Sequence, residues 1–194
     1  MPNLTAFFSY VIVTTFTPGP NTIMSMSNAA KYGFKKSLPF IFGVFAGFIT
    51  ILALSGIFSL SLYKIVPSIK PIMTTIGAVY ILYLAWKIYK SEPNTDNDYE
   101  KATNTFISGM LLQFVNIKGI LFCLTTLSTF IIPYYRSVFE IILFCIAISF
   151  VALISNLCWS LFGSLFQRFI RKNNKMINTI MALLLVYCAV SLFL

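Results

Sequence analysis

One lysine and one proline-rich run carry the chemistry that this sequence offers. The run Thr17-Pro18-Gly19-Pro20-Asn21 interrupts the first apolar stretch, and Lys118 lies well inside the fourth. Two prolines around a glycine remove backbone donors and loosen a helix, which leaves backbone groups free to bind a ligand. A lysine in the middle of a membrane-spanning stretch costs about 3 kcal/mol on insertion scales, which favours a role at an internal polar site over structural pairing.

The sequence offers Lys118 no acidic partner within an apolar stretch. All five carboxylates (Glu92, Asp96, Asp98, Glu100 and Glu140) lie in the middle linker or near a helix end. Freed carbonyls, amide side chains, water and a substrate carboxylate are the remaining partners. We favour the carboxylate, because N–H groups where the helix restarts near Asn21 attract anions. A substrate amine would then meet carbonyls freed at the proline break.

Several amides and one tyrosine complete the predicted binding site. Asn116 and Gln113 would position the carboxylate beside Lys118. Tyr80 either reaches the site or only satisfies its hydroxyl against a neighbouring helix, and Asn156 either lines the site or joins two helices. The predicted substrate-binding residues are Pro18, Gly19, Pro20, Asn21, Tyr80, Gln113, Asn116, Lys118 and Asn156.

The elements that position these residues are membrane helices. The 194-residue chain is 58% hydrophobic and 10% charged, whereas a soluble domain carries about 25% charged residues. A helix needs about 20 apolar residues to cross a bilayer. Six stretches meet this length, so we predict an all-α polytopic membrane protein with six transmembrane helices. They lie near residues 4–27, 38–61, 68–89, 105–131, 139–163 and 176–194.

The positive charges predict an orientation. Ten of the 14 Lys and Arg residues fall in the connections after the first, third and fifth stretches, and three fall in the other connections. Because such residues gather on the cytoplasmic side, both termini are expected outside. Trp86 beside Lys87 fits an anchor at the inner interface. The net charge of +9 is spread over short loops, which favours membrane topology over nucleic-acid binding.

Six helices divide into two halves of three, and an odd number inverts the second half. We predict one transmembrane domain over 1–194, with a first repeat at about 1–90, a polar linker at 91–104 and a second repeat at about 105–194. Inverted repeats place a substrate site at their interface, built from interrupted helices. One half is expected to rock against the other. Gly43 and Gly47 have the spacing of a close helix contact.

The inventory argues against catalysis and cofactors. The chain contains no histidine, no P-loop and no carboxylate pair in an apolar stretch, and its four cysteines lie in apolar runs without a CxxC pair. No cofactor or metal site is expected. Metal-ion export would require intramembrane Asp, Glu, His or clustered Cys. An intramembrane enzyme using Lys118 and a structural membrane subunit remain as alternatives.

Longer motifs resemble a known family. The run 17–21 with Gly33, Gly43 and Gly47 is similar to the N-terminal signature of the lysine-exporter family of bacterial amino-acid exporters. Residues 77–87 (GAVYILYLAWK) resemble its third-helix signature. Residues 113–118 (QFVNIK) through 127–130 (LSTF) resemble the fourth helix of its cysteine and O-acetylserine branch.

The resemblance implies a six-helix secondary exporter in the bacterial cytoplasmic membrane, with small neutral amino acids such as cysteine or O-acetylserine as first choice. Threonine, homoserine or basic amino acids are alternatives, and a homo-oligomer is compatible with the sequence. Two positions depart from the family pattern. Ile117 stands where many relatives have proline, so a less sharply broken fourth helix is expected. Phe48 stands where many carry an acidic residue, which removes a candidate for proton coupling.

Overall fold

The chain folds into helices. The computed structural model describes residues 4–57, 59–90, 102–135, 137–166, 169, 172–191 and 193, and no strand occurs among them. The all-α prediction is therefore confirmed for the described part of the chain. The elements are α1 (Leu4–Phe16), α2 (Pro20–Tyr32), α3 (Phe34–Ile57), α4 (Ser59–Tyr89), the short 3-10 turn η1 (Ala102–Asn104), α6 (Phe106–Val115), α7 (Ile117–Thr125), the π-helical η2 (Thr126–Ile131), α8 (Val138–Leu165) and α10 (Asn174–Ser191).

Most of the predicted apolar stretches correspond to one helix or to a broken helix, but the stretch 38–61 covers most of α3 and also the start of α4. The first is divided into α1 and α2, and the fourth into α6 and α7 with η2. In the described part of the chain, three helices are long and apolar enough to span a membrane (α3, α8 and α10), and α6 with α7–η2 forms a fourth candidate bent by 66°. The count of six spans remains a prediction, and linker residues 91–101 lie outside the described ranges.

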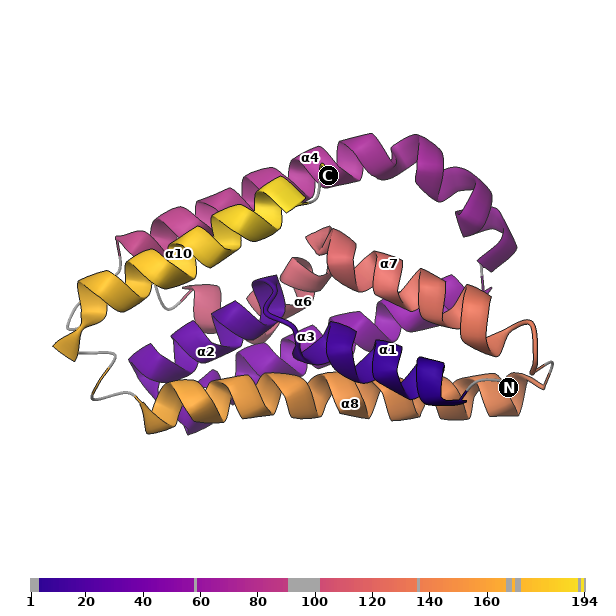
Figure 1. Cartoon of the computed structure of the whole chain (residues 1–194), viewed down its shortest axis with the longest axis horizontal. Coiled ribbons are helices and arrows are strands. Elements are labelled where there is room, and N and C mark those ends of the chain that lie inside the picture. The colour runs from indigo at the N-terminus through magenta and orange to yellow at the C-terminus, as the bar shows by residue number, and fades with distance from the viewer. Residues whose placement is uncertain are drawn as a thin grey trace.

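Both broken helices change direction at mid-length of an elongated bundle (Figure 1). Helix α8 runs along one side of the bundle, and α4 and α10 lie side by side on the other. Helices α1, α2, α6 and α7 lie between them, so that the start of α2 and the start of α7 both fall near the centre. The fold therefore places the two helix breaks in its middle layer.

Helices from the two halves of the sequence pack in pairs. The most extensive contacts join α3 to α6, α2 to α8, and α4 to α10. Glycines permit two of these approaches, because a Cβ at Gly109 would collide with the Phe40 carbonyl and one at Gly163 with the Met26 carbonyl. A Cβ at Gly43 would likewise meet the Phe106 carbonyl. The predicted helix contact at Gly43 is confirmed, and its partner is α6.

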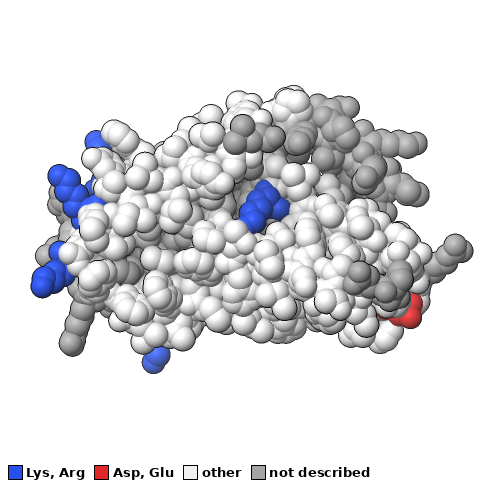
Figure 2. All heavy atoms as spheres, viewed as in Figure 1, with Lys and Arg blue, Asp and Glu red and all other residues white. Residues whose placement is uncertain are grey.

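Two apolar clusters fill the interior, one toward each end of the bundle. The first joins α2, the first part of α3, the last part of α4, α6 and α10. The second joins α1, the last part of α3, α7 with η2, and α8. Figure 2 shows basic side chains gathered at one end, one acidic side chain at the other, and a further basic side chain in a hollow midway between them. A polar region thus lies between two apolar layers.

Candidate functional site

The first break lies between the end of α1 and the start of α2. Gly19 is extended, with φ −162° and ψ 177°, and Pro20 occupies the first position of α2. Proline suits this position because its fixed φ matches the helix and its missing N–H would have no helical acceptor. The Gly19 N–H donates to Thr22 Oγ1 at 2.9 Å. The sequence pattern Pro-Gly-Pro therefore produces a complete restart of the helix.

Two side chains of α8 donate hydrogen bonds to backbone carbonyls at the end of α1. Ser155 Oγ donates to the Thr15 carbonyl at 2.8 Å, and Trp159 Nε1 donates to the Phe16 carbonyl at 3.3 Å. These two carbonyls, which were expected to be free for a substrate amine, each accept one hydrogen bond from α8. Neither Ser155 nor Trp159 was predicted as a site residue, and their only signal was proximity to Asn156 in the sequence.

The second break occurs at Asn116, with no proline involved. Asn116 lies between α6 and α7, and its side-chain oxygen accepts from the Gly119 N–H at 3.2 Å. An asparagine at this position caps the new helix by satisfying one of its unpaired N–H groups. The fourth stretch bends by 66° at this point, although Ile117 stands where many relatives have proline.

Lys118 connects the two breaks. It occupies the second position of α7, and its Nζ donates to the Thr17 carbonyl at 3.1 Å. The side chain lies against Gly19, where an added Cβ would come 3.4 Å from Nζ. The lysine therefore reaches from one interrupted helix to the other across 101 positions of sequence.

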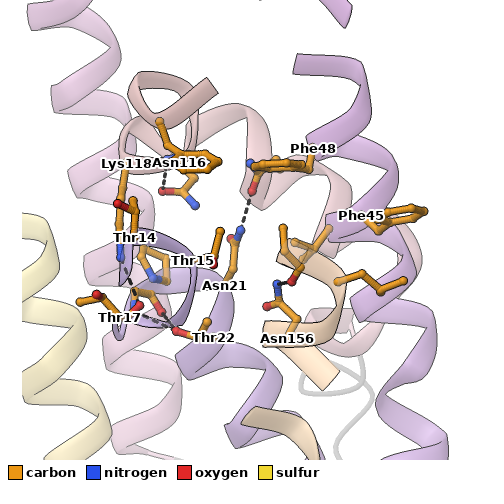
Figure 3. A pocket seen from close by; sticks show the side chains of 18 of the residues that line it. Thr14, Thr15, Thr17, Asn21, Thr22, Phe45, Phe48, Asn116, Lys118 and Asn156 are labelled. Carbon is orange, nitrogen blue, oxygen red and sulfur yellow. Dashed lines mark hydrogen bonds between the residues drawn. The ribbon is translucent and has the colours of Figure 1, made fainter. Parts of the chain in front are cut away.

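A cavity surrounds these groups. Its empty space, counted together with the open mouth, is about 570 Å³. Figure 3 shows Lys118 on one side of this pocket, Asn156 on the other and Asn21 between them. The lining residues come from both breaks and from the walls of α3 and α8, and they are Thr14, Thr15, Thr17, Gly19, Pro20, Asn21, Thr22, Ile41, Val44, Phe45, Phe48, Gln113, Asn116, Lys118, Gly119, Phe122, Ala152, Leu153 and Asn156.

Amide side chains join the walls of the cavity. Asn21 Nδ2 donates to Gln113 Oε1 at 2.5 Å, which connects α2 with α6. Asn156 accepts from Ser25 Oγ at 3.0 Å and donates to the Ala152 carbonyl of its own helix at 2.9 Å. Asn156 therefore fulfils both readings that the sequence left open, because it lines the cavity and joins α8 to α2.

The electrostatics of the cavity favour an anion. Lys118 is its one charged lining residue. The N-termini of α2 and α7 both begin at the cavity, and each carries a partial positive charge from its unpaired N–H groups. Across the described residues, no cluster of His, Cys, Asp or Glu could hold a metal ion. The positive potential of the cavity therefore comes from one lysine and two helix N-termini.

Seven of the nine predicted site residues line the cavity, and two do not. Pro18 is exposed beside it. Tyr80 lies in α4 with its ring centroid 6.3 Å from that of Tyr83, and it packs against the apolar cluster of α2, α3, α4, α6 and α10. The aromatic wall of Phe45, Phe48 and Phe122 was not predicted, because phenylalanines in apolar stretches look the same whether they face lipid or a cavity.

Known proteins resemble the chain over almost its whole length. The family described as LysE type translocator matches residues 12–194. Cysteine/O-acetylserine efflux proteins of Salmonella choleraesuis (strain SC-B67) and Salmonella typhimurium are 40% identical over 98% of this chain and 97% of their own. The protein of that name from Escherichia coli (strain K12) is 38% identical over the same shares. No solved structure matches the chain.

Proposed function

This chain belongs to the LysE type translocator family, and from that premise we propose that it exports small neutral amino acids, cysteine and O-acetylserine first among them. Membership makes it a membrane transporter and not an enzyme. The substrate class follows the names of relatives that are 38–40% identical over 98% of the chain. The cavity at the two helix breaks is the proposed substrate site, and the lipid bilayer is its surroundings.

The observation that carries the proposal is Lys118 in a cavity without an acidic lining residue. A lysine at mid-membrane is costly unless its charge is paired. Among the described contacts, its Nζ donates to the neutral carbonyl of Thr17. A substrate carboxylate would pair with the ammonium and would also face the positive N-termini of α2 and α7.

The lining favours an uncharged substrate side chain. Opposite the polar breaks, α3 presents Ile41, Val44, Phe45 and Phe48 to the cavity. A basic amino acid would bring a second positive charge to a wall that has no carboxylate to receive it. Export of lysine or arginine is therefore less well supported than export of cysteine, O-acetylserine, threonine or homoserine.

The apolar clusters on either side of the cavity support alternating access. One cluster separates the cavity from the basic end of the bundle, and the other separates it from the opposite end. Opening one cluster at a time would carry the substrate across. The basic end would be cytoplasmic by the positive-inside rule, which places the N-terminus outside. Ion or proton coupling is the energy source in this proposal.

The test is export from proteoliposomes that contain the full chain. Labelled cysteine and O-acetylserine would be compared with threonine, homoserine and lysine, for the unmodified protein and for Lys118→Met and Lys118→Arg. Lys118→Met is expected to lower export at least tenfold, since one charged hydrogen bond contributes about 1.5–3 kcal/mol. Lys118→Arg keeps the positive charge but changes the length and shape of the side chain, so partial export is expected. Lys172→Met, at an exposed lysine that does not line the cavity, is the control.

Each result has a clear meaning when the variants reach the membrane in equal amounts. Unchanged export by Lys118→Met would refute the carboxylate site. Export of lysine in preference to cysteine would refute the substrate class but leave the family function intact.

A further inference from the structure

The amide pair of Asn21 and Gln113 leaves two buried polar atoms without a partner. Asn21 Nδ2 donates to Gln113 Oε1. Asn21 Oδ1 and Gln113 Nε2 are buried and make no hydrogen bond within the described structure. Gln113 is fully buried, at 0% exposure. Buried polar atoms are nearly always satisfied, so an acceptor and a donor left open beside one cavity indicate a ligand.

The other amide oxygens of the cavity are already occupied. Asn116 Oδ1 accepts from the Gly119 N–H, and Asn156 Oδ1 accepts from Ser25 Oγ. Gln113 Oε1 accepts from Asn21. Among the four amide side chains that line the cavity, Asn21 alone presents an oxygen with no hydrogen bond.

Three backbone carbonyls at the break also accept hydrogen bonds. Those of Thr15, Phe16 and Thr17 accept from Ser155, Trp159 and Lys118 respectively. An ammonium group needs acceptors, and the cavity lining contains no carboxylate. Asn21 Oδ1 is therefore the side-chain amide oxygen that remains open at this site.

We propose that Asn21 Oδ1 recognises the α-ammonium group of the substrate, while Gln113 Nε2 and Lys118 face its carboxylate. The inference rests on the proposed function and deepens it by separating the two ends of the amino acid. Reversing both amides would move the open acceptor to Gln113 and the open donor to Asn21, and the pair would still offer one of each. The two neutral amides thus offer an acceptor to the ammonium and a donor to the carboxylate of a zwitterion. Lys118 is the charged residue among those that line the cavity.

The test uses three thiols of similar size. Cysteine carries both charged groups, 3-mercaptopropionate lacks the ammonium, and cysteamine lacks the carboxylate. Binding is measured as the thermal stabilisation of the purified full chain, and export is measured as efflux of labelled cysteine with each thiol as competitor under reducing conditions. The unmodified protein should bind cysteine more tightly than either analogue by on the order of tenfold or more, which is the effect expected of one hydrogen bond to a charged group.

Two variants should each remove one of these two preferences and keep the other. Asn21→Leu is expected to reduce the preference for cysteine over 3-mercaptopropionate to within about threefold, because the loss of the acceptor removes the contribution of the ammonium. Its preference over cysteamine should remain. Lys118→Met should give the reverse pattern. Asn21→Ser, which removes the amide without adding bulk, serves if Asn21→Leu does not fold.

Asn104→Leu is the matched control. Asn104 also has a buried side-chain oxygen without a partner, but it lies outside the cavity and its amide donates to the Lys36 carbonyl at 2.8 Å. This variant should keep both preferences.

The outcomes separate this inference from the proposed function. If Asn21→Leu and Asn21→Ser keep the full preference for cysteine over 3-mercaptopropionate, ammonium recognition by Asn21 is refuted. If the unmodified protein binds cysteine selectively but exports none, the proposed function fails and the binding inference stands. If it neither binds nor exports cysteine, both are overturned.

Discussion

The ammonium of Lys118 donates to the carbonyl of Thr17 at 3.1 Å, which ties the first turn of α7 to the segment that follows α1. The same cation is the group proposed to hold the substrate carboxylate. Binding would therefore draw the lysine away from Thr17, or would add the carboxylate as a second acceptor. Either change alters the connection between two interrupted helices, so occupancy of the site and the geometry of the breaks are coupled.

The cap that α8 places on α1 can be tested with a matched pair of serines. Ser155→Ala removes the hydrogen bond to the Thr15 carbonyl, and Ser149→Ala removes one to the Cys145 carbonyl within α8. Hydrogen bonds between membrane helices average about 0.6 kcal/mol. We expect Ser155→Ala to lower the thermal stability and the export rate, and Ser149→Ala to leave the export rate unchanged. Equal export by both variants would argue against a role for this cap.

The second break should accept a proline at its first helical position. Ile117 is the first residue of α7, where a proline costs little because its N–H has no acceptor within the helix. Ile117→Pro is expected to retain folding and export. Leu121→Pro, in the interior of the same helix, should lose about 3 kcal/mol or more and prevent folding. Fluorescence-detected size exclusion and cysteine efflux measure the two results, and loss of folding in Ile117→Pro would contradict the assigned start of α7.

The cap of α7 depends on a side-chain oxygen. Asn116→Ala leaves the Gly119 N–H without its acceptor, which should cost about 0.5–2 kcal/mol. Asn116→Ser retains an acceptor and should recover most of the loss. The thermal unfolding midpoints of the three proteins measure this order. A midpoint for Asn116→Ala equal to that of the unmodified chain would show that the cap does not stabilise the fold.

The close approach of α3 and α6 predicts a strong effect at Gly109. An added side chain would meet the Phe40 carbonyl and the backbone of Val44. Overpacking costs about 1–3 kcal/mol or more, so Gly109→Leu should lower the yield of folded protein and its thermal midpoint. Gly56→Leu is the control, since no atom of the described residues lies within 4 Å of a Cβ there. Comparable losses in both variants would contradict the packing of α3 on α6.

The proposed orientation predicts which end of the bundle is labelled from outside the cell. In a chain whose four cysteines are replaced by alanine, Lys35→Cys at the basic end should resist a membrane-impermeant maleimide until the membrane is opened. Glu140→Cys, at the start of α8, should react in intact cells. Both positions are exposed, so burial does not confuse the result. The reverse labelling pattern would invert the topology and place the N-terminus inside.

Much of the fold could be predicted, because its signals are local. The apolar stretches gave most helix ends within several residues, although α4 (Ser59–Tyr89) begins well before the predicted stretch 68–89. Pro18 and Pro20 gave the first break, and Gly43 gave a close helix contact. Lys118 and Asn116 belonged to the predicted site because polar groups inside apolar stretches are costly and therefore informative.

The remainder depended on contacts between distant residues. Nothing in the sequence near Ser155 or Trp159 indicates that these side chains cap α1, since the pairing joins residues more than 100 positions apart. Tyr80 failed to reach the cavity for a similar reason: its helix packs with α10, and none of the residues lining the cavity belongs to α4. The hydrogen-bond partners of each amide side chain could likewise be read only from the three-dimensional structure.

The pairing of α3 with α6, α2 with α8 and α4 with α10 bears on how the chain is assembled. Helices enter the membrane in order during synthesis, so α2, α3 and α4 would be inserted before α8, α6 and α10, which pack against them. The glycine face of α3 would stay unpaired until α6 arrives, and the end of α1 would stay uncapped until α8 follows. Folding therefore completes only after insertion of the second half. Residues 1–90 and 105–194 produced as separate polypeptides should each be degraded alone and should accumulate when made together.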